Sequence, residues 1–201
     1  MLGYSEKVPL LIYEYADYGT LYWLLSKGWK PSQKDILLTG IQLGDTLRYL
    51  HSRGLIHGDI KPGNILIKNR ISKLGDFSSI TKLLTSTSHS GIHGVAPGTI
   101  GFRAPEQVYS DIMKRAKKED LENRIDVYQL ANLIRYMWTE ELLDEEEAID
   151  GKYVEKILSK IPDEELREIL AKALDSEPSK RPSAEELAKA LYKIYTKTTK
   201  T

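Results

Sequence analysis

The hydrophobic and polar positions in the first third of this chain predict a short strand, a long helix and a second strand. Residues 10–15 are apolar or aromatic except Glu14 and are followed by turn formers, which indicates a strand, and leucines at helical spacing come next. From Ser32 to Gly54 the apolar residues fall on one helical face, and Ser32 with Asp35 predicts a capping box at its start. Residues 65–67 are apolar throughout, which is typical of a buried strand.

The second half of the chain predicts helices packed around a buried one. Residues 125–138 are apolar around nearly the whole circumference of a helix, as expected at the centre of a domain. Residues 161–174 and 183–194 are amphipathic, and Ser183 with Glu186 predicts a second capping box. The pattern therefore predicts a mainly α fold, a helical bundle around a buried central helix with a few short β-strands.

Three segments lack a core-forming pattern. Residues 83–94 are rich in Ser, Thr, His and Gly, which predicts a mobile loop. Residues 113–122 predict a charged helical turn with a solvated face. Residues 196–201 form a polar tail that we expect to fray.

Composition narrows the classes of function. The 201 residues are 41% hydrophobic and 29% charged, as in an ordinary soluble domain. Lys plus Arg and Asp plus Glu each number 29, so no net field favours nucleic acid or an anionic membrane as a partner. No apolar run is long enough to span a bilayer, and the absence of cysteine excludes disulfides and thiolate metal sites. We expect a cytoplasmic protein.

The strongest candidate for chemistry is the loop at residues 57–64, with the sequence HGDIKPGN. Asp59, Lys61 two residues on and Asn64 five residues on have the spacing of a phosphoryl-transfer loop. The carboxylate orients or deprotonates a hydroxyl, the lysine meets the transferring phosphate and the asparagine ligates a metal. His57 is expected to be a packed, hydrogen-bonded brace rather than an acid or base. His-Gly-Asp stands in small-molecule phosphotransferases and His-Arg-Asp in protein kinases, so the loop alone leaves both open.

Four further motifs favour protein kinases. The chain resembles that family in LGDFS at residues 74–78, GTIGFRAPE at 98–106, RIDVYQL at 124–130 and KRPS at 180–183. Small-molecule phosphotransferases lack the second of these motifs, which builds a docking surface for a peptide. From about residue 10 to residue 195 the chain is similar to the large lobe of a Ser/Thr protein kinase, with its strands at the catalytic cleft.

The resemblance implies an ATP and magnesium site and gives each site residue a role. Asp59, Lys61 and Thr99 would be catalytic, with Thr99 bridging the other two. Tyr13 would lie at the back of the nucleotide pocket, the backbone of Glu14 and Ala16 would bond the adenine, and Leu66 would pack beneath it. Asn64 and Asp76 would hold Mg²⁺. The nine residues are Tyr13, Glu14, Ala16, Asp59, Lys61, Asn64, Leu66, Asp76 and Thr99.

The resemblance also implies structural contacts and has two departures. Glu106 and Arg181 would form a buried ion pair, and Asp126 would hydrogen-bond the backbone of the catalytic loop. Gly58 replaces the arginine that usually receives an activation phosphate, so we expect activity that depends little on such phosphorylation. Ser78 replaces a glycine, which permits a positive φ that serine adopts only at a cost, so we expect this departure to restrict the inward and outward flip of Asp76 and to leave it in place as a metal ligand.

By the same resemblance, residues 1–201 form a single domain lacking most of the small lobe. Residues 8–19 would be the last small-lobe strand and the hinge, 20–195 the large lobe and 196–201 the polar tail. We expect no glycine-rich phosphate loop, no strand lysine and no helix glutamate, because only a dozen residues precede Tyr13.

Three functions stay open at this point. The first is a kinase that phosphorylates Ser or Thr hydroxyls of a protein substrate, with its small lobe absent or supplied by a second chain or segment. The second is an inactive binding or scaffold module of pseudokinase type. The third is a small-molecule phosphotransferase.

Overall fold

The computed structural model describes residues 3–5, 10–82 and 98–199. The loop predicted at residues 83–94 lies outside these ranges. The α-helices are α1 (Leu21–Ser26), α2 (Gln33–Ser52), α3 (Pro105–Val108), α4 (Ser110–Lys118), α5 (Arg124–Thr139), α6 (Gly151–Leu158), α7 (Glu164–Ala173) and α8 (Ala184–Thr198). The strands are β1 (Gly3–Ser5), β2 (Leu10–Ile12), β3 (Leu55–Ile56), β4 (Ile65–Lys68), β5 (Ile71–Leu74) and β6 (Thr81–Lys82).

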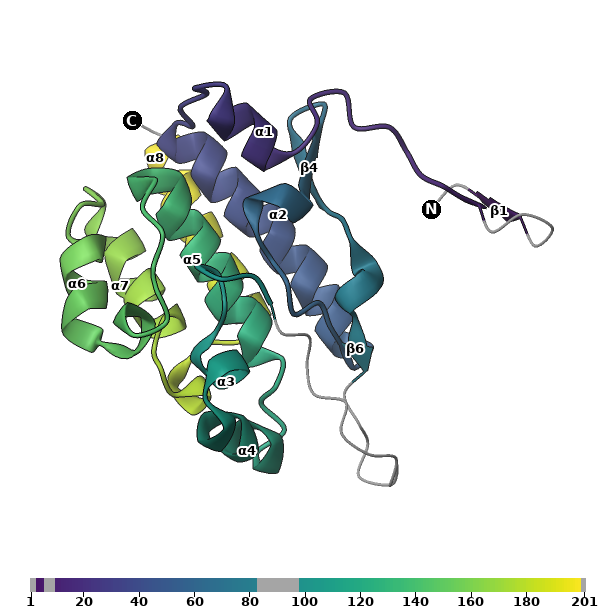
Figure 1. Cartoon of the computed structure of the whole chain (residues 1–201). Coiled ribbons are helices and arrows are strands. Elements are labelled where there is room, and N and C mark those ends of the chain that lie inside the picture. The colour runs from purple at the N-terminus through teal and green to yellow at the C-terminus, as the bar shows by residue number, and fades with distance from the viewer. Residues whose placement is uncertain (1–2, 6–9, 83–97, 200–201) are drawn as a thin grey trace.

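Helix α5 occupies the middle of the helical body, with α2 on one side and α6 and α7 on the other (Figure 1). Every residue of α5 from Ile125 to Arg135 is buried. The prediction of a mainly α fold around a buried central helix is therefore confirmed. No helix in the described ranges has the length and apolar character needed to cross a membrane.

The buried central helix is not apolar on every side. Asp126, Gln129, Asn132 and Arg135 recur every third residue, and each is at most 1% exposed. Residues three apart lie on one face of a helix, so these four form a buried polar stripe along α5. Asn132 donates to the carbonyl of Gly101, and Arg135 donates to Oδ1 of Asn132. The sequence prediction gave the burial of this helix correctly but missed the stripe.

Helices α2 and α8 begin as predicted and pack closely together. Both capping boxes are present, Ser32 with Asp35 and Ser183 with Glu186. A Cβ atom on Gly44 would lie 2.9 Å from Cβ of Ala188, closer than real Cβ atoms approach. Glycine at this position of α2 therefore lets α8 approach the helix backbone.

The end of α8 and helix α6 differ from the prediction. Helix α8 continues to Thr198. The expected fraying of the tail is therefore wrong for residues 196–198. The hydroxyls of Thr196 and Thr198 donate to carbonyls one turn back, and these bonds keep polar side chains compatible with the helix. Helix α6 was not predicted. Helix α4 overlaps the predicted charged turn but starts earlier, at Ser110.

The strands form three antiparallel pairs, β1 with β2, β3 with β6 and β4 with β5. Asn69 and Arg70 join β4 to β5 with φ of 49° and 64°, which matches the twist of a tight hairpin. The strand predicted at residues 10–15 ends at Ile12. An extended segment then leads from the β1–β2 hairpin, which lies apart from the helical body, to α1 (Figure 1).

Candidate active site

The loop at residues 57–64 is held from behind by the start of α5. Asp126 is fully buried and accepts hydrogen bonds from the backbone N–H of His57 (3.0 Å) and of Gly58 (2.7 Å). Its Oδ2 also lies 2.8 Å from Nε2 of His51, at the end of α2. The predicted contact between Asp126 and the loop backbone is confirmed. A buried carboxylate with three partners fixes the loop in one position.

Gln129, one turn further along the stripe, holds the middle of the loop. Its Oε1 accepts from the N–H of Ile60 (2.9 Å), and its Nε2 donates to the carbonyl of Gly58 (3.0 Å). Gly58 has a φ of 76°, a conformation that strains residues with a side chain. The backbone at this position therefore favours glycine.

The side chain of His57 is a buried brace, as predicted. Its Nε2 lies 3.0 Å from the carbonyl of Gly75, and its Nδ1 accepts from the N–H of Asp59 at 3.3 Å. The ring also meets Phe77 edge to face, with centroids 5.6 Å apart. The imidazole therefore connects the loop to the segment that follows β5.

Asp59, Lys61 and Thr99 form a closed ring of polar contacts. The hydroxyl of Thr99 donates to Oδ1 of Asp59 (2.7 Å) and accepts from Nζ of Lys61 (2.7 Å). The same Nζ lies 2.7 Å from Oδ2 of Asp59. Thr99 comes from a segment distant in sequence, so the fold brings together all three residues that were predicted to be catalytic.

Asn64 joins this ring from the far end of the loop. Its Nδ2 donates to the carbonyl of Asp59 (2.8 Å) and to Oδ2 of the same residue (3.2 Å). These bonds use the amide nitrogen and leave the amide oxygen out, and oxygen is the atom that Mg²⁺ takes as a ligand. The backbone carbonyl of Asn64 accepts from the N–H of Gly75 (2.8 Å), which ties the loop to β5.

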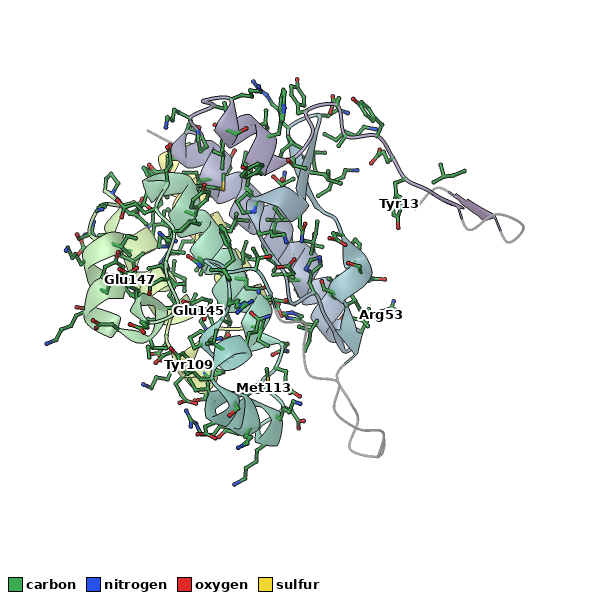
Figure 2. All side chains as sticks on the ribbon, in the orientation of Figure 1. Tyr13, Arg53, Tyr109, Met113, Glu145 and Glu147 are labelled. Carbon is green, nitrogen blue, oxygen red and sulfur yellow. The ribbon has the colours of Figure 1, made fainter. Side chains whose placement is uncertain are left out.

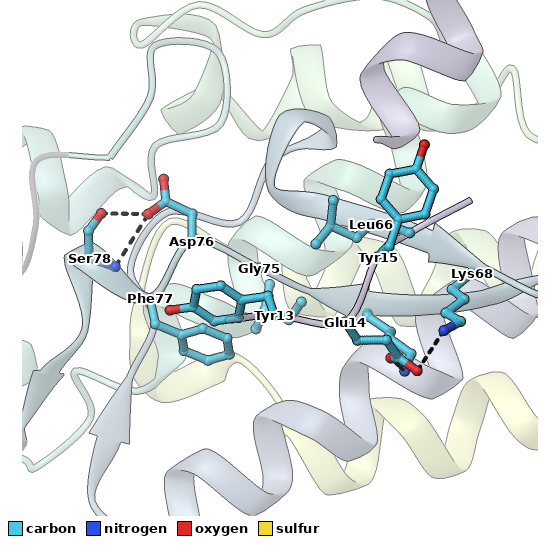
Figure 3. Close-up of a pocket in the computed structure, with 12 residues that line it drawn as sticks. Tyr13, Glu14, Tyr15, Leu66, Lys68, Gly75, Asp76, Phe77 and Ser78 are labelled. Carbon is cyan, nitrogen blue, oxygen red and sulfur yellow. Dashed lines mark hydrogen bonds and ion pairs between the residues drawn. The ribbon is translucent and has the colours of Figure 1, made fainter. Parts of the chain in front are cut away.

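Asp76, the second predicted metal ligand, is exposed and has a φ of 54°. Its Oδ1 accepts from the hydroxyl (2.6 Å) and the N–H (3.3 Å) of Ser78. These bonds from Ser78 hold the pKa of the Asp76 carboxyl below its usual value, so the group stays ionised. The second carboxylate oxygen points away from Ser78 (Figure 3).

Ser78 does not adopt the positive φ that a glycine would permit at this position. Positive φ falls on Asp76, whereas Ser78 sits in a short 3-10 helix and is not among the described residues with positive φ. The serine therefore bears no such strain. Its hydroxyl instead orients the carboxylate two residues before it.

A cavity of about 790 Å³ lies beside Asp76, between the extended segment and the β4–β5 hairpin (Figure 3). All four predicted nucleotide-binding residues line it, namely Tyr13, Glu14, Ala16 and Leu66. Its volume falls within the range of small-molecule sites. A Cβ on Gly75 would lie 3.0 Å from Leu66, so glycine leaves room there. Tyr13 is 59% exposed and lines the cavity from an open side.

Two lysines on the wall of this cavity were missed by the sequence prediction. The carboxylate of Glu14 forms ion pairs with Lys68 (2.8 Å) on β4 and with Lys73 on β5. Hydrogen bonds from the two ammonium groups, first Lys68 and then Lys73, lower the pKa of the Glu14 carboxyl to about 2. Lysines on short strands resemble ordinary solvated residues, so no local pattern identified them.

The segment at residues 98–106 lies against the helical body through polar and aromatic contacts. Phe102 packs edge to face on Tyr136, with centroids 5.4 Å apart. Arg103 bonds Oε1 of Glu145 (2.9 Å), and the hydroxyl of Tyr109 donates to the carbonyl of Glu145. Tyr109 and Glu145 lie on the same side of the molecule in Figure 2.

The predicted ion pair between Glu106 and Arg181 is confirmed. The guanidinium donates to both carboxylate oxygens, at 2.6 and 2.8 Å, and both side chains are fully buried. The guanidinium also lies over the ring of Tyr128, 4.9 Å from its centroid. Among the described residues, no three His, Cys, Asp or Glu side chains gather as a metal-binding set.

Taken together, the fold is a helical domain with an Asp–Lys–Asn loop and an acidic residue after the next hairpin. The family model described as "Protein kinase domain" matches residues 3–193 of the chain. The chain belongs to the protein kinase family.

Two relatives illustrate the similarity. The chain is 30% identical over 198 residues to the interferon-induced, double-stranded RNA-activated protein kinase of Mus musculus, a match that covers 94% of this chain and 35% of that protein. It is 33% identical over 158 residues to serine/threonine-protein kinase D of Synechocystis sp., covering 74% of this chain and 29% of that protein. The chain thus spans about a third of the length of these relatives.

Proposed function

We propose that this chain is the catalytic lobe of a Ser/Thr protein kinase, which transfers the γ-phosphate of ATP to a protein hydroxyl with magnesium. The observation that carries the proposal is the closed ring of Asp59, Thr99 and Lys61. It places a carboxylate and an ammonium group side by side, as required where a hydroxyl attacks a phosphate.

Asp59 retains capacity for a substrate hydroxyl. An ionised carboxylate has about four lone-pair sites. Among the described residues, its Oδ1 accepts one hydrogen bond, from Thr99, while Oδ2 meets Lys61 and Asn64. A substrate hydroxyl can therefore donate to Oδ1. As its oxygen bonds to the γ-phosphorus and the bond to the leaving ADP breaks, the hydroxyl proton passes to this carboxylate.

Lys61 and the two predicted metal ligands neutralise charge. The ammonium group of Lys61 lies beside Asp59 and can meet the transferring phosphate as a point charge. Asp76 stays ionised and exposed next to the cavity, and Asn64 keeps its amide oxygen out of its bonds to Asp59. These oxygens fit Mg²⁺, which would neutralise phosphate charge when bound.

Three observations favour a protein substrate with a Ser or Thr hydroxyl. Lys61 two residues after Asp59 and the bridging Thr99 resemble the Ser/Thr members of the family. Ile100, in the segment expected to dock a peptide, is 68% exposed, so an apolar side chain is available to a partner. The Synechocystis relative is itself named a serine/threonine-protein kinase.

The test is phosphate transfer from labelled ATP to a generic basic protein, followed by identification of the modified amino acid. We expect phosphoserine or phosphothreonine from the wild-type chain. Asp59→Asn should lower the rate by about 10²- to 10⁴-fold, the usual contribution of a general base. Aminoglycosides or choline as the only phosphorylated acceptors would contradict the proposal and favour a small-molecule phosphotransferase.

A binding module is the second candidate, because the extended segment is open on one side. Ile12, Tyr13 and Tyr15 are 49%, 59% and 81% exposed. Such a surface would suit a partner chain that supplies the small lobe. Nucleotide binding without transfer, from wild type and Asp59→Asn alike, would favour this function over the kinase.

A further inference from the structure

We propose that Glu14, Lys68 and Lys73 form an ionic clamp that sets the position of the nucleotide-binding segment over the β4–β5 hairpin. The inference rests on the proposed function, because the ligand that the segment positions is ATP. It makes Glu14 a positioning residue through its side chain, a role separate from the adenine contact expected of its backbone.

The register of the hairpin places both lysines on the face that carries Leu66. Leu66 pairs with Lys73, and Lys68 pairs with Ile71. Directly opposite residues point to the same face of a sheet, as do residues two apart on a strand. Leu66, Lys68 and Lys73 therefore share one face, and all three line the cavity. The ammonium group of Lys68 reaches from this face to the carboxylate of Glu14 (Figure 3), and the ammonium group of Lys73 pairs with the same carboxylate.

Among the described residues, the other backbone hydrogen bonds lie at the far end of the segment, from Ala16 onward. The N–H of Tyr18 donates to the carbonyl of Ile67 (3.2 Å), and the N–H of Ile67 donates to the carbonyl of Gly19 (2.9 Å). Oδ1 of Asp17 accepts from the N–H of Asn69 (3.3 Å). Within the described ranges, residues 13–16 are extended without strand pairing. The clamp therefore acts where the bonds from residues 17–19 do not reach.

The clamp is ionic and lies in water, which decides what can loosen it. The side chains of Glu14, Lys68 and Lys73 are 41%, 28% and 42% exposed. The lowered pKa of Glu14, about 2, keeps its carboxylate charged near neutral pH. Salt screens charges that are in contact with solvent, so ionic strength is the variable that weakens the clamp.

A loosened clamp should weaken nucleotide binding and leave chemistry intact. The ring of Asp59, Lys61 and Thr99 is fixed by its own contacts and by α5, and none of them involves Glu14. Exposed ion pairs are individually weak, so loss of two pairs should raise the Kd and the KM for ATP about three- to tenfold. The kcat should change less than about twofold.

The experiment compares wild type, Glu14→Gln and the double variant Lys68→Gln/Lys73→Gln. ATP affinity is measured by calorimetric titration, kcat and KM by phosphate transfer, and the amides of residues 13–16 by hydrogen exchange. Glu165→Gln is the matched control, because Glu165 is a similarly exposed, lysine-paired carboxylate on α7, away from the cavity. Raising salt from about 50 mM to about 500 mM should weaken ATP binding by wild type more than by Glu14→Gln.

We expect both clamp variants to raise the Kd with faster exchange at residues 13–16, while Glu165→Gln matches wild type. Equal ATP affinity of wild type and Glu14→Gln overturns the clamp, as does an effect of Glu14→Gln that the double lysine variant does not reproduce. A charge-reversed triple variant, Glu14→Lys with Lys68→Glu and Lys73→Glu, should recover part of the lost affinity. The wild-type chain could instead bind no ATP while the clamp variants still exchange faster than wild type at residues 13–16. That result would overturn the proposed kinase function, and the clamp would remain as a contact that holds the segment in place.

Discussion

The two sides of the site are held by opposite means. On the loop side, the fully buried carboxylate of Asp126 accepts two backbone hydrogen bonds and meets His51. On the nucleotide side, the carboxylate of Glu14 is 41% exposed and meets two lysines in water. Both are carboxylates with several donors, so burial is what distinguishes them.

Burial changes what each contact contributes. Removing one partner of a buried charged pair costs about 3 to 5 kcal/mol, because the remaining group is left without water or partner. An exposed pair contributes about 0.2 to 1 kcal/mol, because water replaces whatever is lost. The loop that we propose carries the chemistry is therefore rigid, whereas the segment that we propose meets the nucleotide can be adjusted by salt and by substitution.

Asp126→Ala should have the largest effect on stability. It leaves the N–H groups of His57 and Gly58 and the ring of His51 without their acceptor inside the protein. We expect a loss of about 3 to 5 kcal/mol in the free energy of unfolding, a large part of the stability of a typical domain. Urea unfolding measures it. Asp126→Asn, which keeps one acceptor oxygen, should lose clearly less, and an equal loss would show that the three contacts do not act as described.

Glu106→Gln should be the next most disruptive change. The substitution keeps the shape of the side chain but leaves the buried guanidinium of Arg181 without its counter-charge. We expect a loss of about 3 kcal/mol. Glu165→Gln removes an exposed lysine-paired carboxylate and should leave the free energy of unfolding nearly unchanged. Similar losses in the free energy of unfolding for the two variants would contradict the distinction between buried and exposed ion pairs.

Thr99→Val tests the ring of polar contacts among Asp59, Lys61 and Thr99. The variant keeps the shape of the side chain and removes its bonds to Asp59 and Lys61, which still meet directly at 2.7 Å. We expect a stability loss of about 1 kcal/mol and a fall in kcat of about tenfold. Thr99→Ser, which retains the hydroxyl, should recover most of the rate. A normal kcat in Thr99→Val would remove Thr99 from the catalytic ring.

Glu122→Gln should have the smallest effect and the opposite sign. Glu122 lies just before α5 and is half-buried, and its buried Oε2 has no hydrogen-bond partner among the residues that the structure describes. Burial raises the pKa of its carboxyl above the ordinary value of 4.5, so the ionised form destabilises the folded state as pH rises. The variant should gain less than about 1 kcal/mol at pH 8 and lose that gain below about pH 4.5. Thermal unfolding at both pH values measures the difference.

Local sequence patterns predicted the parts of the fold that local physics determines. The capping boxes of α2 and α8 require only two side chains three residues apart, and the burial of α5 follows from its apolar composition. The residues of the loop and of the cavity came from motifs, and the structure places them in two clusters joined by Asn64 and Gly75. Their catalytic and binding roles stay predictions.

The contacts that were missed join residues far apart in the chain. Gln129 bonds a loop about 70 positions away, and Glu14 meets Lys73 across a similar separation. From its local sequence, each of these side chains is indistinguishable from an ordinary polar residue in a helix, in a strand or in a segment before a turn. Only the tertiary fold decides whether such a residue meets solvent or a partner. Neither the hydrophobic periodicity nor the spacing of motifs therefore reveals the contact.

The close approach of α8 to Gly44 of α2 bears on how the domain folds during its synthesis. Gly44 packs against Ala188, so α2 reaches its final packing only after α8 has been synthesised. Until then α2 has an uncovered apolar face, and contacts at such long separation form late in folding. The face of α2 around Gly44 can therefore be covered only after residues near 188 have left the ribosome.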